Sequence, residues 1–239
     1  METQRAGLPS TRWGPMEAAT GAAFSVVALI AFLLALGPSD TSGEGVFRYY
    51  AKHDTAVEWQ TLLFGIAAVL LLWFAGTVWS AARAADPATG GRYGGILLAA
   101  AGTSVALYSA GLAAWFTLAL SFGGATGSTP DLPTRVDAYT IWNLSDAAFS
   151  LSNFPASVFV AAATLALTQT RLMPSWSAWV GGGVALYLVI NGCIQALSNS
   201  DAANTLGIIA FLLFLAWVFL ASVVLTRRAA QGSQPVAMD

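Results

Sequence analysis

Charged side chains are scarce in this chain: Asp, Glu, Lys and Arg together make up 9% of its 239 residues. A soluble globular domain has about 25% charged residues. With 56% hydrophobic residues, this chain has too few charges to cover a surface exposed to water. A chain that is solvated mainly by lipid needs no more. The composition therefore excludes an ordinary soluble domain and indicates an integral membrane protein.

Cysteine and histidine each occur once, as Cys193 and His53. A single cysteine cannot form an intrachain disulfide, and a thiolate or histidine metal site needs several such ligands. The sequence has no zinc-protease, P-loop, serine-hydrolase or dinucleotide-binding motif. We therefore expect no catalytic residues, no metal and no cofactor. The formal net charge of -2, without a basic patch, also argues against a nucleic-acid partner.

Six long apolar stretches follow one another along the chain, and each can supply the roughly 20 residues of a membrane-spanning helix. They lie within residues 17–36, 59–82, 93–122, 138–168, 176–197 and 202–226. None alternates like a barrel strand, and every backbone group in lipid must be hydrogen-bonded, so we expect helices. The sequence predicts an all-α, polytopic transmembrane helical bundle. It consists of an N-terminal segment (1–16), a six-helix transmembrane domain (17–228) and a C-terminal tail (229–239).

Basic residues are divided unequally between the two sides of such a bundle. Three of them lie in segments on the side away from the termini: Arg48, Lys52 and Arg135. Seven lie on the side of the termini: Arg5, Arg12, Arg83, Arg92, Arg171, Arg227 and Arg228. Because cytoplasmic segments carry an excess of Lys and Arg, we expect both termini to be cytoplasmic.

A polar stripe runs along the fourth apolar stretch and consists of Asn143, Asp146, Ser150 and Asn153. Steps of three and four residues keep these side chains on one face of a helix. Asp146 is the one acid expected within a span, and an ionisable group there is a candidate functional residue. An untilted helix would place Asp146 at the outer membrane boundary and Asn153 deeper, whereas a tilted helix would bring Asp146 closer to the membrane core. Pro155 should kink the helix beside Asn153.

The fifth stretch carries a second polar set, Asn191 and Gln195, spaced one helical turn apart. If the fourth and fifth helices are neighbours, these amides can face Asn153 and Asp146. Two interpretations remain open. The polar groups form a pocket or pathway for a ligand or ion, or they form hydrogen bonds between helices that fix the packing of the bundle.

The segment after the first stretch, residues 46–53, places Phe47, Tyr50 and Ala51 on one helical face. This pattern predicts a short interfacial helix. The helix can serve as a lid or partner contact, or it can rest on the lipid headgroups. The second interpretation is favoured, because interfacial segments of this kind commonly lie on the membrane surface.

The segment 171–179 reads RLMPSWSAW and is followed by three glycines at 181–183. This segment resembles the linker that opens the fifth span in a family of bacterial, often actinobacterial, six-span membrane proteins of unknown function. The Phe-Arg pair at 47–48 resembles an element that follows the first span in the same family. The resemblance implies six helices and a multi-pass protein of the bacterial plasma (inner) membrane. It implies no activity and no catalytic residues.

The sequence leaves two functions open. The first is a non-enzymatic bundle that binds a small ligand, a membrane-protein partner or a second copy of the chain within the lipid bilayer. The alternative is a small transporter or channel with a polar site between the fourth and fifth helices. Transport requires a cavity lined by the polar residues of these helices, whereas tight pairing of their side chains without a cavity would exclude transport through them.

Overall fold

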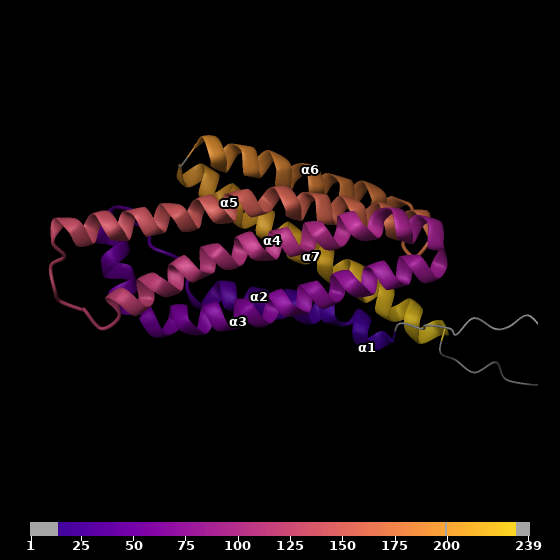
Figure 1. Ribbon diagram of the computed structural model, residues 1–239, viewed down its shortest axis with the longest axis horizontal. Coiled ribbons are helices and arrows are strands. Elements are labelled where there is room, and N and C mark those ends of the chain that lie inside the picture. Colours follow the sequence, from indigo (N-terminus) through magenta and orange to yellow (C-terminus); the bar gives the residue numbers. More distant parts are fainter. Residues whose placement is uncertain (1–13, 199, 233–239) are drawn as a thin grey trace, which may run out of the picture.

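The computed structural model describes residues 14–198 and 200–232, and every regular element within these ranges is a helix (Figure 1). The bounds are α1 Pro15–Ala18, α2 Thr20–Leu34, α3 Gly43–Ala85, α4 Pro87–Phe122, α5 Leu132–Gln169, α6 Trp176–Leu197 and α7 Asp201–Gly232. Six of the described helical segments are long and apolar enough to cross a membrane, with α1 and α2 counted together. The prediction of an all-α bundle with six spans is therefore confirmed.

The predicted boundaries differ in quality from one helix to the next. The fifth span was expected at 176–197, and α6 occupies those residues. The second was expected at 59–82, but α3 begins sixteen residues earlier, at Gly43. Residues 43–53 are also helical, and α3 leaves helical geometry only at His53, where φ is -118° and ψ is 20°. The short helix predicted at 46–53 thus begins at Gly43 and joins the span at His53.

The helices form a ring in chain order. Each long helix packs against the next, and α7 returns to contact α2 and α1, while α3 also contacts α5. The described ends of the chain lie at one end of the bundle, on the right in Figure 1. We call this the proximal end and the opposite one the distal end. The outer faces carry exposed apolar side chains such as Leu33, Leu62 and Leu186, which suit contact with lipid.

The proximal half of the ring is closely packed. Phe74, Val78 and Leu167 are fully buried there. Small residues let the helices approach: a Cβ added to Gly181 of α6 would lie 2.0 Å from the Thr164 hydroxyl of α5. This close approach is the usual way in which membrane helices pack, because lipid gives them no hydrophobic drive to associate.

Ser222 of α7 joins the two segments of the first span. Its hydroxyl accepts a hydrogen bond from the Ala22 N–H at 2.9 Å and donates one to the Ala18 carbonyl. These two backbone groups lie where α1 gives way to α2, so the serine inserts into the backbone ladder of the span. Ser222 is fully buried, so the contact holds α7 against the start of the chain's first span.

The first part of α3, residues 43–53, crosses the distal end of the bundle (Figure 1). We call it the cap segment. Ser42 caps its N-terminus by accepting the Gly45 N–H at 3.1 Å. Its apolar face is buried against α4 and α5, and the Phe47 and Phe122 rings lie 5.1 Å apart. The predicted helix is confirmed, but its apolar face packs onto the protein instead of remaining free for the headgroups.

Candidate functional site

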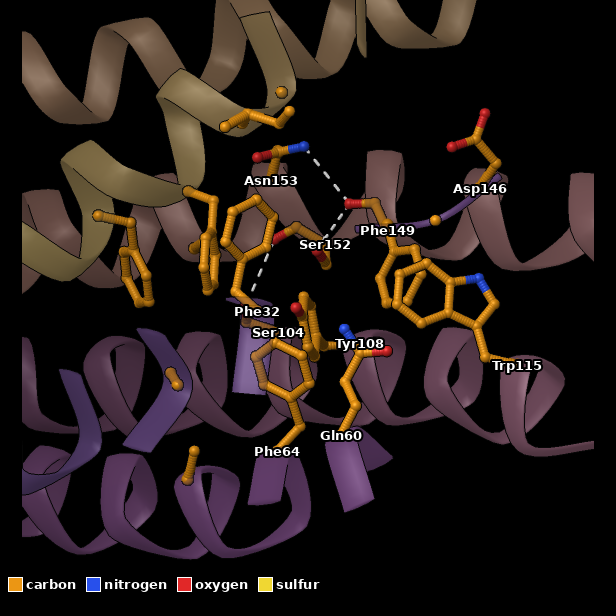
Figure 2. Close-up of a pocket in the computed structure, with 18 of the residues that line it drawn as sticks. Phe32, Gln60, Phe64, Ser104, Tyr108, Trp115, Asp146, Phe149, Ser152 and Asn153 are labelled. Carbon is orange, nitrogen blue, oxygen red and sulfur yellow. Dashed lines mark hydrogen bonds between the residues drawn. The ribbon is translucent and has the colours of Figure 1, made fainter. Parts of the chain in front are cut away.

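The distal half of the bundle contains a cavity of about 330 Å³, to which every helix from α2 to α7 contributes residues (Figure 2). Ligand pockets usually measure about 300–1,000 Å³, so the volume suits a small organic molecule. α5 and α7 line the cavity and are in little contact with each other, whereas α7 packs well against α2 and α6.

Aromatic side chains form one wall, which we call the aromatic chamber: Phe64, Tyr108, Trp115 and Phe149. The Phe149 ring lies 4.9 Å from Tyr108 and 4.8 Å from Trp115, measured between ring centroids. The Trp115 Nε1–H donates to the Ser145 hydroxyl at 2.9 Å. Because this polar atom is already bonded, Trp115 offers the cavity its ring. The chamber is a rigid apolar surface.

The floor of the cavity is closed by phenylalanines. Phe24 of α2 and Phe214 of α7 meet edge to face at 6.0 Å. Behind them, the Phe159 ring lies 6.3 Å from Phe214 and 6.0 Å from Trp217. These contacts join α2, α5 and α7 at mid-bundle, so the cavity does not continue into the proximal half.

The distal end of the cavity is bordered by the loop between α2 and α3. Leu36 and Thr41 of this loop line the cavity and are exposed, as is Asn204 at the start of α7. The loop turns at Gly37, whose φ of 88° favours glycine. The Gly37 N–H donates to the Tyr49 hydroxyl of the cap segment at 3.1 Å. A ligand would therefore reach the cavity from the distal end, beside this tethered loop.

Gln60 of α3 is the most deeply buried polar side chain in the lining, with 1% of its surface exposed. Its Nε2 donates to the Ala35 carbonyl at 2.7 Å and so satisfies the C-terminal end of α2. Its Oε1 has no hydrogen-bond partner within the described part of the chain. Figure 2 shows the amide pointing between Tyr108 and Trp115. The chamber thus contains a buried acceptor that lacks a donor, which is costly unless a ligand or water supplies one.

Asp146 of α5 is the only charged residue among the described residues that line the cavity. It is partly buried, and no hydrogen bond or ion pair to its carboxylate occurs among the residues that the structure describes. In Figure 2 its carboxylate lies to one side of the Phe149 ring, along the same edge of α5 as Asn153. An ionised carboxylate in such a place needs a cation or several donors.

Asn153 joins α5 to α6. Its Nδ2 donates to the Gln195 Oε1 at 3.2 Å and also to the carbonyls of Phe149 and Ser150. Asp146, Asn153 and Gln195 all line the cavity, and we call them the polar rim. The structure therefore brings three of the residues singled out in the sequence to one cavity.

The other residues singled out in the sequence lie elsewhere. The Ser150 hydroxyl donates to the Asp146 carbonyl of its own helix at 2.8 Å. Asn191 is buried outside the cavity lining, and neither atom of its amide has a partner among the described residues. Asn143 is partly buried and also outside the lining. α5 continues as one helix through Pro155, and the kink expected there stays a prediction.

The sequence interpretation missed the residues that α3 and α4 contribute. Gln60 is a lone amide just inside the second apolar stretch, directly after Trp59. That position resembles the end of a span, where polar residues are common. Tyr108 and Trp115 are seven residues apart, two helical turns, and so share one face of α4. This spacing was the available signal for an aromatic wall.

The described part of the chain contains no group of three or more His, Cys, Asp and Glu residues arranged to hold a metal ion. The described lining of the cavity offers aromatic rings, amides and one carboxylate. In comparisons with known proteins, no family model, no curated protein and no solved structure matches the chain.

Proposed function

We propose that this membrane protein binds a small molecule in the distal cavity and does not act as an enzyme. The observation that carries the proposal is the composition of the cavity: rigid aromatic walls with unpartnered polar atoms, the Gln60 Oε1 and the Asp146 carboxylate. Pockets that bind small molecules combine an apolar lining with a few placed polar groups of this kind.

We also propose that the protein lies in a bacterial plasma membrane with both termini in the cytoplasm. The support is the distribution of basic residues: Arg83, Arg92 and Arg171 fall in the proximal connections, between or beside the spans. Arg5 and Arg12 lie outside the described residues. In this orientation the cavity opens away from the cytoplasm. The resemblance to actinobacterial six-span proteins points to the same location.

Transport of the ligand is a second candidate function. It is favoured by the one-sided cavity, because a carrier in one of its states has a site open to one side and closed to the other. The floor contains aromatic contacts, such as Phe24 with Phe214 and Phe159 with Phe214, which can repack without breaking hydrogen bonds. Uptake into proteoliposomes of a ligand shown to bind would separate a carrier from a binding protein.

Thiol labelling tests whether the cavity is accessible from the distal end. Ser152 and Ser157 of α5 are both buried, and each hydroxyl donates to the carbonyl three residues earlier. Only Ser152 lines the cavity. In a Cys193→Ser background, purified and reconstituted Ser152→Cys should react with a water-soluble maleimide, and Ser157→Cys should not. Equally slow reaction of both variants would contradict an accessible cavity.

A further inference from the structure

Many hydrogen-bond donors of the cavity lining are already bonded to acceptors within the protein. The donors of five lining residues are already used: Gln60, Ser104, Trp115, Ser152 and Asn153. Two lining residues keep acceptors without a hydrogen-bond partner among the described residues: Gln60, through its Oε1, and Asp146, through its carboxylate. A ligand that only accepts hydrogen bonds would leave these atoms unpaired. A ligand that carries positive charge would pair with the carboxylate, and a ligand that donates a hydrogen bond would pair with the Gln60 Oε1.

The charge of the cavity has one sign. No Arg, Lys or His side chain belongs to the described lining, so the protein supplies no cation to Asp146 there. The basic residue in the first turn of α5, Arg135, donates to the Pro130 carbonyl and pairs with Glu44 at 3.4 Å. Removing a carboxylate from water without a partner is costly, and a cationic ligand would supply the partner that the lining lacks.

Aromatic rings connect the carboxylate with the chamber. Trp142 precedes Asp146 by one helical turn, so the two share a face of α5, and both line the cavity. The Trp142 ring is parallel to that of Trp115, with an interplanar angle of 5° and centroids 5.9 Å apart. The faces of Trp and Tyr rings attract cations. The rim therefore offers a carboxylate beside a tryptophan, and the chamber offers rings for an apolar body.

We propose that the ligand is an organic cation with an apolar body, whose ammonium group faces Asp146 and Trp142 while its body occupies the aromatic chamber. This inference rests on the proposed function, since it names the class of molecule that the same cavity takes. Free amphiphilic amines and quaternary ammonium compounds share this chemistry. Anions are disfavoured by the unpaired carboxylate, and neutral aromatic molecules gain from the rings alone.

Equilibrium dialysis of the purified, detergent-solubilised full chain against benzyltrimethylammonium tests the proposal. The Asp146→Asn variant keeps the volume and removes the charge, and Asp137→Asn is the matched control, because Asp137 is an exposed acid of α5 outside the cavity lining. We expect Asp146→Asn to weaken binding about two hundredfold, from the attraction of two charges about 5 Å apart at an effective dielectric constant of about 20. Asp137→Asn should change binding by less than about twofold, because exposed charges are screened.

A neutral probe separates the class of ligand from the existence of the site. The wild-type protein should bind benzyltrimethylammonium at least about tenfold more tightly than 2-phenylethanol, which has the ring but no charge. This comparison needs no variant, so it holds even if Asp146→Asn fails to fold. Equal binding of both probes, unchanged by Asp146→Asn, would refute the proposal that the ligand is a cation but would still support a ligand site in the cavity. Binding of neither probe, with no labelling of Ser152→Cys, would overturn both the cation and the proposed function.

Discussion

Gly111 of α4 marks the place where α4 comes closest to the Phe149 wall of the cavity. A Cβ added there would lie 2.6, 2.7 and 2.9 Å from three atoms of the Phe149 ring. Carbon atoms in contact are normally about 3.5–4.0 Å apart, so the ring would have to move by about 1 Å. Tyr108 and Trp115 flank the ring at 4.9 and 4.8 Å. The Gly111→Ala change should therefore strain the aromatic chamber.

The size of the effect follows from a comparison with Gly102→Ala on the same helix. A Cβ at Gly102 meets nothing within 4 Å. Both changes gain about 1 kcal/mol of helix propensity, so this contribution cancels in the difference between them. Overpacking costs about 1–3 kcal/mol. Gly111→Ala should thus unfold with a free energy about 1–3 kcal/mol below that of Gly102→Ala.

Reversible unfolding in mixed micelles with increasing sodium dodecyl sulfate, followed by circular dichroism, measures this difference. The two variants share helix, residue type and added methyl group, so they differ mainly in the Phe149 contact. Equal unfolding free energies for Gly111→Ala and Gly102→Ala would refute the close approach of α4 and α5. Equal values would also contradict the rigid aromatic wall on which ligand recognition by the chamber depends.

Two further predictions concern other parts of the bundle. Ser222→Ala should lower the free energy of unfolding by about 1–3 kcal/mol, since it leaves the Ala22 N–H and Ala18 carbonyl without the Ser222 hydroxyl; the exposed Ser109→Ala should change it little. Hydrogen bonds from the Thr89 hydroxyl and the Ala88 N–H lower the pKa of Asp86 below 3.8. Its stabilising effect is therefore present above pH 3.8 and lost as the pH falls through the lowered value. The unfolding free energies of wild type and Asp86→Asn, measured by the same method, should converge as the solution is acidified; a constant difference would contradict this.

The spans could be predicted from the sequence because each depends on a local property, an apolar run of sufficient length. The cap segment shows where this approach fails. Its helix has one apolar face and many polar residues, so its average composition resembles a loop, and only contact with Phe122 and its neighbours on α4 and α5 shows where that face packs.

The candidate site could be predicted only along single helices. The spacing of Asp146 and Asn153 placed them on one face of α5, and both line the cavity. The same spacing grouped Asn191 with Gln195, yet only Gln195 reaches the cavity. Helical periodicity gives a direction around one axis, whereas a cavity depends on how far apart neighbouring helices lie. That separation also brings Gln60 from α3 to the site.

The rate of thiol labelling at Ser152→Cys, relative to Ser157→Cys, is the most direct measurement of the central claim that the distal cavity is an accessible ligand site. It should be made both in native membranes and after purification and reconstitution. We predict a rate at least about tenfold faster for Ser152→Cys than for Ser157→Cys in the purified protein, because only Ser152 lines the cavity. A ligand bound in native membranes should slow the first rate and leave the second unchanged. Equal rates for the two variants in both preparations would contradict the account.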